Sequence, residues 1–454
     1  HNRLAIIGLE PESDQPMLIE DSYHIVFNGE IYNYKKIKDE LIALGEKFIT
    51  SSDTEVILRG YKIFGVDIFC KLKGMFAVII FDKLKQELIV SRDSFGIKPL
   101  YVHRSKDNTF AFSSSVKALK ETIDFNFSLN KQSKLLFEWF GFIPEPQTVY
   151  NDINAVEAGT TYIYSVHGVQ VTSRKDKLEN IYLNNQDANY SKNSKKTLVE
   201  NISFSINAHL VSDVPLSIFL SSGIDSNLIA YLAKKKHNSK LFAQTLSVNS
   251  LTGSKYDEEI LAKKTASKLG LDINIKRADS KLIKEDSENI LKIMDQPSVD
   301  GLNIYMLSKE VKAKKFKVSL VGTGADELLC GYSFYNSLPY IHHLRMNIFF
   351  KFMSKKINGA FKSTKLLKLF DTTLPCNDIL DSYILQRSLR PPSSLLERYS
   401  KDEIIGAHKY IRNAIGTNVI NSRLNIRSKL MFFDQNFYLK NQLLRDCDWA
   451  SMSH

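Results

Sequence analysis

The stretch LSIFLSSGIDS, at residues 216–226, joins a short apolar run to a loop of small residues and then to a helical pattern. A strand that passes through small residues into a helix is typical of a parallel sheet covered by helices. Backbone N–H groups in such a loop can approach an anion, and the helix N-terminus adds positive potential. We therefore expect an α/β domain whose loop over Leu220–Ser226 faces a phosphate, although an ordinary turn capped by serine has the same pattern.

A second loop of this kind lies about 100 residues further along the chain. The apolar run Val318–Val321 leads into VGTGADE at residues 321–327, and Gly331-Tyr332 closes the segment. Because ligands bind at the carboxyl ends of parallel strands, the two loops can share one nucleotide. Asp225 and Asp326 can then share one Mg²⁺ on its phosphates. Neither loop matches the P-loop or the GxGxxG dinucleotide motif.

The chain divides at a polar, Asn- and Lys-rich stretch, residues 173–196, which is the best linker. After it, longer helices alternate with short strands, and the sequence is mostly helical beyond residue 335. Before it, short strands alternate with helices, and Ser52-x-x-Glu55 predicts a capping box that starts a helix. The strands expected in the first part are Tyr23–Asn28, Met75–Asp82, Gln86–Ser91 and Thr109–Ser113. We expect domains over residues 1–172 and 197–454.

Composition excludes several classes of protein. With 43% apolar and 24% charged residues in 454, the chain is globular and not disordered throughout. The four cysteines lie far apart without a CxxC pair, which fits a reducing, cytoplasmic location. No apolar run reaches the roughly 18 residues of a membrane span. The formal charge of +11 is the sole support for a nucleic-acid partner, and we expect none, because no nucleic-acid motif accompanies it.

Motifs in both halves resemble the glutamine-hydrolysing asparagine synthetase family. The family's patterns match FNGEIYN at 27–33, SDTE at 52–55, RDSFGIKPLY at 92–101 and the arginine-bearing strand NRLAII at 2–7. The two small-residue loops match its SGGxDS and GxGxDE…GY segments, and LLRD with Ser451-Met452 matches its LLRDxDxxSM segment. The chain begins at His1 and stops within that last segment, so we expect a piece of a longer protein.

The resemblance implies an amidotransferase domain built as an αββα sandwich, followed by a parallel-sheet synthetase domain of the ATP-pyrophosphatase type. It implies adenylation of a carboxylate by ATP and Mg²⁺, and displacement of AMP by ammonia from glutamine. Arg3 would bind the glutamine α-carboxylate and Asp53 the α-ammonium, while Asn28 and Gly29 would stabilise the oxyanion and Glu30 would line the pocket. On residues alone, Asn28-Gly29 could equally be a type I′ hairpin turn, and Asp53 could serve the helix N-terminus.

The family's nucleotide-binding and metal roles map onto the two loops and one further strand end. The ATP-binding residues would be Leu220, Ser221, Ser222, Gly223, Ile224, Asp225, Ser226, Val248, Val321 and Gly322. Asp225 and Asp326 would bridge the metal. The implied partners are glutamine and aspartate or another carboxylate, with assembly as a homodimer.

Some positions depart from the family pattern. The family's nucleophile is an N-terminal cysteine, so the chain as printed, starting at His1, is expected not to hydrolyse glutamine by that route. Thr323 stands where the synthetase loop usually carries an acid, and threonine supplies no charge. Gln296 and Ser115 stand where glutamate is common. These changes leave open amidation of a sugar acid, β-lactam-type ring closure, or a catalytically silent nucleotide-binding protein. The basic stretch 345–370 is expected to form an amphipathic helix packed on the synthetase core, with a membrane surface as the alternative.

Overall fold

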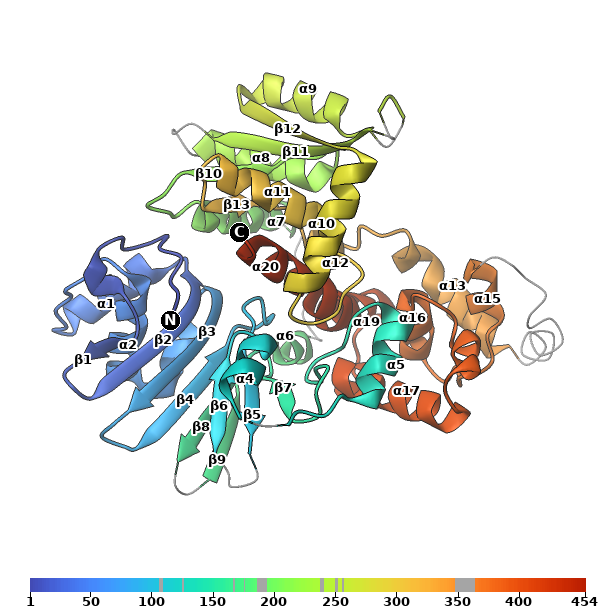
Figure 1. Ribbon diagram of the computed structural model, residues 1–454, viewed down its shortest axis with the longest axis horizontal. Helices are drawn as coiled ribbons and strands as arrows, with labels where there is room; N and C mark the ends of the chain where they lie inside the picture. The colour runs from blue at the N-terminus through green and yellow to red at the C-terminus, as the bar shows by residue number, and fades with distance from the viewer. Residues whose placement is uncertain are drawn as a thin grey trace.

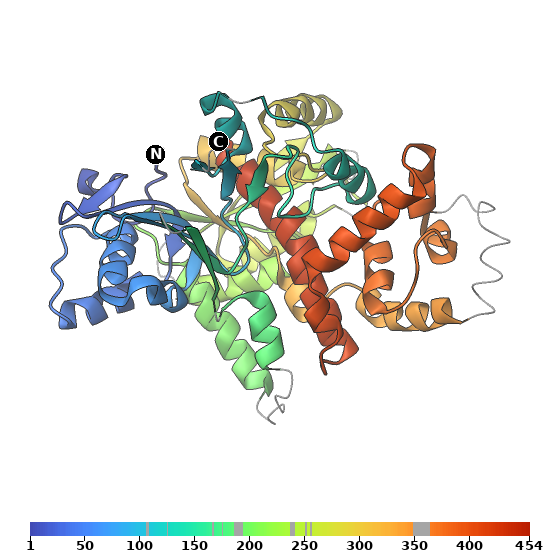
Figure 2. The ribbon, with the colours of Figure 1, turned by 90° about the horizontal axis from the view of Figure 1, so that it is seen from below.

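The computed structural model describes residues 1–105, 109–124, 126–165, 168–174, 176–185, 194–236, 241–249, 252–254, 257–347 and 364–454. Three bodies of structure are visible in Figure 1: antiparallel sheets at the lower left, a parallel sheet at the top, and a group of helices at the right. The two ends of the chain lie near each other (Figures 1 and 2), and Met452 lines the same cavity as Asn2.

The N-terminal part contains two antiparallel sheets. The larger has the order β1-β2-β3-β4-β8-β9, with strands Met17–Ile19, Tyr23–Ile31, Gly74–Asp82, Glu87–Arg92, Thr160–Ser165 and Gly168–Ser173. The smaller has the order β6-β5-β7, with β5 at Tyr101–Arg104, β6 at Phe110–Ser113 and β7 at Ile153–Ala155. The central strands β3 and β4 carry nearly continuous apolar runs, because both faces of the larger sheet are covered.

The two sheets stack between helices. Helices α1 (Tyr34–Ala43) and α2 (Asp53–Phe64) pack their apolar faces on the larger sheet, in a core that includes Ile57, Val78 and Ile80. The other face of that sheet meets the smaller sheet, where Tyr164 packs on Phe110 with ring centroids 4.7 Å apart. Helix α4 (Val116–Thr122) covers the outer face of the smaller sheet. The expected αββα arrangement is therefore confirmed.

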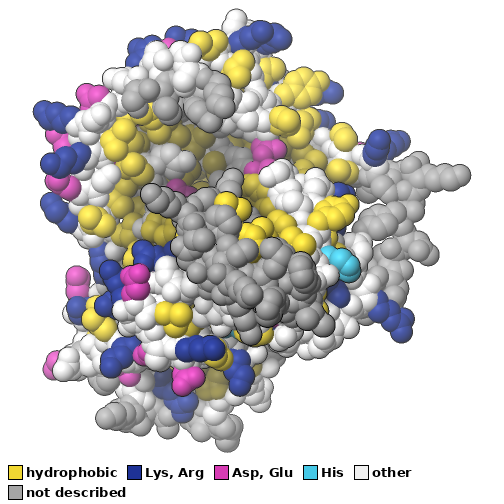
Figure 3. Space-filling view, turned by 90° about the vertical axis from the view of Figure 1, so that its right-hand side faces the viewer, with side chains coloured by type: hydrophobic (Ala, Val, Ile, Leu, Met, Phe, Trp, Pro, Cys, Tyr) yellow, Lys and Arg dark blue, Asp and Glu magenta, His cyan; other side chains and the backbone are white. Residues whose placement is uncertain are grey.

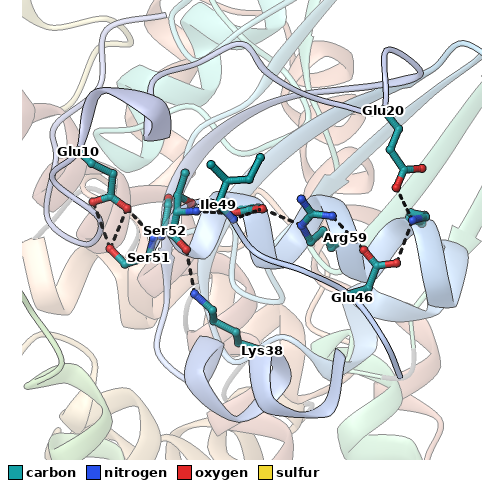
Figure 4. A network of polar contacts seen from close by, with 11 residues as sticks. Glu10, Glu20, Lys38, Glu46, Ile49, Ser51, Ser52 and Arg59 are labelled. Atoms are coloured by element: carbon teal, nitrogen blue, oxygen red, sulfur yellow. Dashed lines mark hydrogen bonds and ion pairs between the residues drawn. The ribbon is translucent and has the colours of Figure 1, made fainter. Parts of the chain in front are cut away.

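The start of α2 differs from the expected capping box. Ser52 does cap the helix, since its hydroxyl accepts from Thr54 N, but Glu55 does not return to the Ser52 N–H. Instead its carboxylate accepts from Ile49 N, Thr50 N and Thr50 Oγ1 and pairs with Arg59 at 2.7 Å (Figure 4). The Ser52 N–H instead donates to Thr50 Oγ1 at 3.2 Å, so the Glu55 carboxylate is bound by the turn before the helix.

The second part is built on a four-stranded parallel sheet with the order β12-β11-β10-β13, as predicted from the βαβ rhythm. Its strands are β10 (Leu216–Phe219), β11 (Phe242–Val248), β12 (Asp272–Ala278) and β13 (Val318–Leu320). The helices of this part are α7 (Ser194–His209), α8 (Ile224–Lys236), α9 (Glu259–Leu269), α10 (Ser280–Ile293) and α11 (Leu302–Ala313). Sequence analysis missed β12 because it is a charged edge strand without an apolar run.

The remaining helices form a third body around a buried aromatic core (Figure 1). Its elements are α5 (Lys131–Phe140), α6 (Leu178–Asn184), α12 (Ala325–Leu329), α13 (Phe334–Met346), α15 (Thr364–Phe370), α16 (Ile379–Arg387), α17 (Lys401–Ile415), α18 (Thr417–Ile420), α19 (Ile426–Phe433) and the π-helix η5 (Asp434–Leu444). The chain then continues into α20 (Arg445–Met452), which packs on α10 and α11 of the parallel-sheet part. Short turns complete the chain: α3 (Ile68–Lys71) and the 3₁₀ segments η1 (Pro11–Ser13), η2 (Gly65–Asp67) and η4 (Pro392–Glu397). Trp139 of α5 is fully buried in this core, so the segment before the polar linker anchors the C-terminal helices.

Three expectations about surfaces and cysteines can be compared with this fold. Most of the basic stretch 345–370, residues 348–363, lies outside the described residues. Among the helices that the structure describes, no segment has the length and apolarity needed to cross a bilayer. All four cysteines are free thiols. Figure 3 shows a hollow, bordered by apolar side chains, on the face at the right of Figure 1.

Candidate functional site

A cavity of about 70 Å³ opens where the N-terminal segment crosses β2 and the start of α2. Its lining includes five residues expected at a glutamine site: Arg3, Asn28, Gly29, Glu30 and Asp53. Asn28 and Gly29 lie inside β2, opposite Ala77 and Phe76 of β3, so the hairpin-turn alternative is wrong. A Cβ on Gly29 would stand 2.1 Å from the Met75 carbonyl oxygen, which explains why glycine is needed at this position.

Arg3 is held in the cavity wall by its own segment. Its guanidinium donates to the carbonyl oxygens of Ile7 at 2.6 Å and Gly8 at 2.7 Å, and lies 3.9 Å from the exposed carboxylate of Asp14. Residues 2–7 form no strand, contrary to expectation. The segment is instead an irregular loop whose carbonyls fix the arginine, and a planar, always charged guanidinium suits a carboxylate ligand.

Two buried carboxyl groups line the same cavity as this arginine. Asp53, 4% exposed, accepts from Ile31 N at 3.0 Å. Burial raises its pKa to about 6, against the opposing effects of that N–H and of the Arg3 charge. Burial, together with the charge of Asp53, raises the pKa of Glu30 to about 8. At neutral pH the pair therefore carries close to one negative charge, which matches a single ammonium group.

Sequence analysis missed two polar side chains of this cavity. The Gln15 side chain accepts from Phe27 N at 2.6 Å and donates to Thr54 Oγ1 at 3.3 Å, which ties β2 to the start of α2. Lys98 Nζ lies 2.9 Å from Asp448 on α20, so a synthetase-side helix reaches the cavity. Lys98 belongs to the RDSFGIKPLY motif, which could have pointed to it. For Gln15, no motif was available.

The two small-residue loops meet at one edge of the parallel sheet. Strands β10 and β13 pair side by side and in parallel, so the loops that follow them emerge together. Gly322 packs directly on Asp225, because a Cβ there would lie 3.2 Å from the Asp225 Cβ. Within the first loop, Ser226 Oγ accepts from Ser221 N at 3.1 Å and Ser221 Oγ accepts from Gly223 N at 3.1 Å, so side-chain hydroxyls close the turn.

The two acids of this edge are close enough to influence each other. Burial, and then the charge of Asp326, raises the pKa of Asp225. Gly331 leaves room for Asp326: a Cβ at Gly331 would stand 1.8 Å from the Asp326 Oδ1. No cluster of three or more potential metal ligands occurs among the described residues. Two repelling carboxylates nevertheless fit Mg²⁺, which takes one or two carboxylates and completes its shell with phosphate oxygens and water.

The other expected nucleotide residues lie around the same edge, and their roles stay predictions. Leu220 is buried and donates its N–H to the Gln244 carbonyl at 2.8 Å, so its side chain belongs to the core. Ile224 is 84% exposed at the start of α8, and Val321 is partly exposed. Ser222 and Gly223 form the exposed turn before α8, and Val248 ends β11 next to them. Apolar surface beside phosphate-facing backbone suits a nucleotide base.

Thr323 stands at the mouth of the second loop and contacts α20. Its hydroxyl is 3.5 Å from the Cys447 thiol, whose pKa is raised to about 11 by burial. Neither group carries charge at neutral pH. The position that the family usually gives to an acid is therefore filled here by a neutral pair.

A second hollow, of about 310 Å³, adjoins the first cavity at Asn28 and Met452, with walls from both parts of the chain and from α20. Asp295 bridges these walls, because its carboxylate accepts from Ser115 Oγ at 2.7 Å and from Val116 N and Lys117 N at 2.9 Å each. Gln296 accepts from Val149 N at 3.0 Å. Both departures from the family pattern, Ser115 and Gln296, thus act in docking the domains.

The geometry therefore offers a cavity suited to a free amino acid, with a second hollow beside it, and a sheet edge suited to a phosphate chain. Comparison with known proteins agrees. The profile of a glutamine amidotransferase domain matches residues 1–175, and the asparagine synthase profile matches residues 197–454.

Two relatives and one solved structure are similar to this chain. Asparagine synthetase [glutamine-hydrolyzing] 1 of Bacillus subtilis is 35% identical over 73% of this chain and 51% of its own length. Amidase chry2 of Gibberella zeae is 29% identical over 73% of this chain and 51% of its own length. This chain thus spans about half the length of these relatives. A solved glutamine phosphoribosylpyrophosphate amidotransferase of B. subtilis is 14% identical over 60% of this chain and 75% of its own, with a TM-score of 0.29.

Proposed function

Because the chain belongs to the asparagine synthase family, we propose that it takes part in ATP-dependent amide synthesis, with ammonia derived from glutamine and release of AMP and pyrophosphate. The single observation that carries the proposal is the presence, in one chain, of the Arg3–Asp53 cavity and the Asp225–Asp326 edge. The charges of the cavity would suit a zwitterion, and the loops of the sheet edge would suit a phosphate chain.

In the first site, glutamine would bind by charge matching. The Arg3 guanidinium would hold the α-carboxylate and Asp53 the α-ammonium, with Glu30 protonated beside it. The side-chain amide of Asn28 and the N–H of Gly29 would donate to the amide oxygen as negative charge develops on it. None of the four cysteines lines the cavity as described, so these residues account for recognition of glutamine and not for its cleavage.

In the second site, the loop Leu220–Ser226 and the Val321-Gly322 turn would hold ATP. Asp225 and Asp326 would hold Mg²⁺, which neutralises phosphate charge when bound. The backbone N–H groups of the first loop and the N-terminus of α8 would orient the phosphates. The acceptor carboxylate would approach past Thr323.

For the acceptor we propose aspartate. A carboxylate of another class is the second candidate, because the neutral Thr323–Cys447 pair replaces the usual acid and one relative is named an amidase. A cytoplasmic location, a homodimer and the absence of a nucleic-acid partner remain predictions.

The test uses the chain with Mg·ATP and ammonium, and measures pyrophosphate release with L-aspartate, L-glutamate, a sugar acid and a β-amino acid in turn. Release that requires both acceptor and ammonium supports the proposal, and the acceptor with the highest kcat/KM identifies the substrate class. Nucleotide binding without acceptor-dependent release would instead support a silent nucleotide-binding protein.

A further inference from the structure

The loop that holds Arg3 is itself docked on the synthetase side of the molecule. Asp213, in the connection from α7 to β10, accepts from Gly8 N at 2.9 Å through its carboxylate and donates its own N–H to the Ile6 carbonyl at 3.1 Å. Lys317 Nζ donates to the Ala5 carbonyl at 3.2 Å. The contacted segment is thus Ala5–Gly8, which we name the docking loop.

Asp213 and Lys317 stand at the amino ends of the two strands that carry the nucleotide loops. Asp213 is three residues before β10, and Lys317 is the residue before β13. Both strands are short, with four and three residues. The docking loop therefore sits at one end of these strands, and Asp225 and Asp326 follow the other end.

Gly8 is the point at which three parts of the molecule meet. Its N–H donates to Asp213, its carbonyl accepts from Arg3, and its Cα lies against Ser52, the residue before Asp53. A Cβ on Gly8 would stand 2.8 Å from the Ser52 Cα, and the φ of Gly8 is +66°. A shift of Gly8 would consequently move Arg3 relative to Asp53.

We propose that Asp213 is a positioning residue for the glutamine cavity, contributed by the synthetase side. It does not line the cavity and it does not contact Arg3, but it fixes the carbonyls that aim the guanidinium at an α-carboxylate. This inference rests on the proposed function, because it takes the ligand to be an amino acid with free α-groups. Asp213 lies outside the segments that match the family's motifs.

The variants separate the hydrogen bond from the charge. Asp213→Ala removes the acceptor for Gly8 N, whereas Asp213→Asn retains an amide oxygen there. We expect Asp213→Ala to weaken L-glutamine binding roughly fivefold, since a partly exposed bond to a charged group is worth less than a buried one. Asp213→Asn should restore most of the affinity. Asp39→Ala is the matched control, because Asp39 is an exposed aspartate of α1 that does not line the cavity.

The measurement is calorimetric titration of the chain with L-glutamine and with 4-aminobutanamide, which lacks the α-carboxylate. The expected result is a loss for Asp213→Ala with L-glutamine alone, and no further loss when Asp213→Ala is added to Arg3→Ala. Equal losses for both ligands, or unchanged glutamine affinity, would overturn the inference while leaving the cavity in place. Failure of the unchanged chain to bind L-glutamine would refute the glutamine cavity itself, and the inference with it.

Discussion

The Arg3–Asp53 cavity and the Asp225–Asp326 edge differ in how deeply their carboxyl groups and neighbours are buried and in how their charges are balanced. In the cavity, Asp53 and Glu30 are 4% and 5% exposed, and their pKa values are raised by burial. At the edge, Ile224 is 84% exposed and the two acids repel each other across Gly322. In the proposed function, the first site would supply its own complementary charges, whereas the second would leave charge to be balanced by a ligand and its metal. The cavity should therefore be sensitive to packing, and the edge to charge.

The largest expected effect is on packing. Gly29→Ala should destabilise the fold by about 3 kcal/mol, because its Cβ would overlap the Met75 carbonyl and force β2 from β3. Gly223→Ala at the edge should cost less than about 1 kcal/mol, since its Cβ would meet only the Ser221 hydroxyl, at 3.2 Å. Urea unfolding of both variants measures the contrast. Similar losses for the two variants would contradict it.

The second largest expected effect comes from removing a carboxylate charge at the nucleotide edge. Asp225→Asn should lower Mg²⁺-dependent pyrophosphate release roughly 100-fold, since loss of a metal ligand removes several kcal/mol of charge stabilisation. Asp39→Asn, on the exposed face of α1, is the control and should change nothing. If ATP·Mg²⁺ titrations give the same affinity for both variants, the metal role of Asp225 is wrong.

Asp53→Asn should separate the two nitrogen sources. The variant is expected to bind L-glutamine about 30-fold more weakly, the equivalent of about 2 kcal/mol for a charge-assisted contact. Ammonium-driven pyrophosphate release should be nearly unchanged, because Asp53 lies away from the nucleotide edge. Equal loss with both donors would mean that Asp53 holds the fold and not the ligand.

The smallest effect is a pH dependence of the same residue. Glutamine's ammonium needs ionised Asp53, whose pKa in the free cavity is about 6, so affinity should fall about tenfold between pH 8 and pH 5. The free energy of unfolding depends on pH in the opposite direction. Because folding raises the pKa of Asp53 to about 6, its carboxyl group stabilises the folded state at low pH, and this contribution is lost as pH rises through about 6. Asp53→Asn should therefore raise the melting temperature at pH 8 and not at pH 4, which thermal scans at both pH values test.

Much of the edge was predictable from the sequence, and less of the cavity. The loops after β10 and β13 are contiguous motifs, and the rules of parallel sheets bring their ends together. The contacts of Gln15 and Asp213 join residues without any shared spacing, so no local pattern signals them. Residues 2–7 do not form the expected strand, because the carbonyls of Ile7 and Gly8 accept from the Arg3 guanidinium and not from a neighbouring strand. Glu55 does not complete the expected capping box, because its carboxylate accepts from the N–H groups of Ile49 and Thr50 in the preceding turn.

The most direct test of the account is simultaneous occupancy of the two sites. L-glutamine and then Mg·ATP are titrated calorimetrically into the same sample of the chain. We expect one site for each ligand, with the affinity for L-glutamine lowered by Asp53→Asn alone and the affinity for Mg·ATP lowered by Asp225→Asn alone. Competition between the two ligands, or loss of both sites through either substitution, would contradict it.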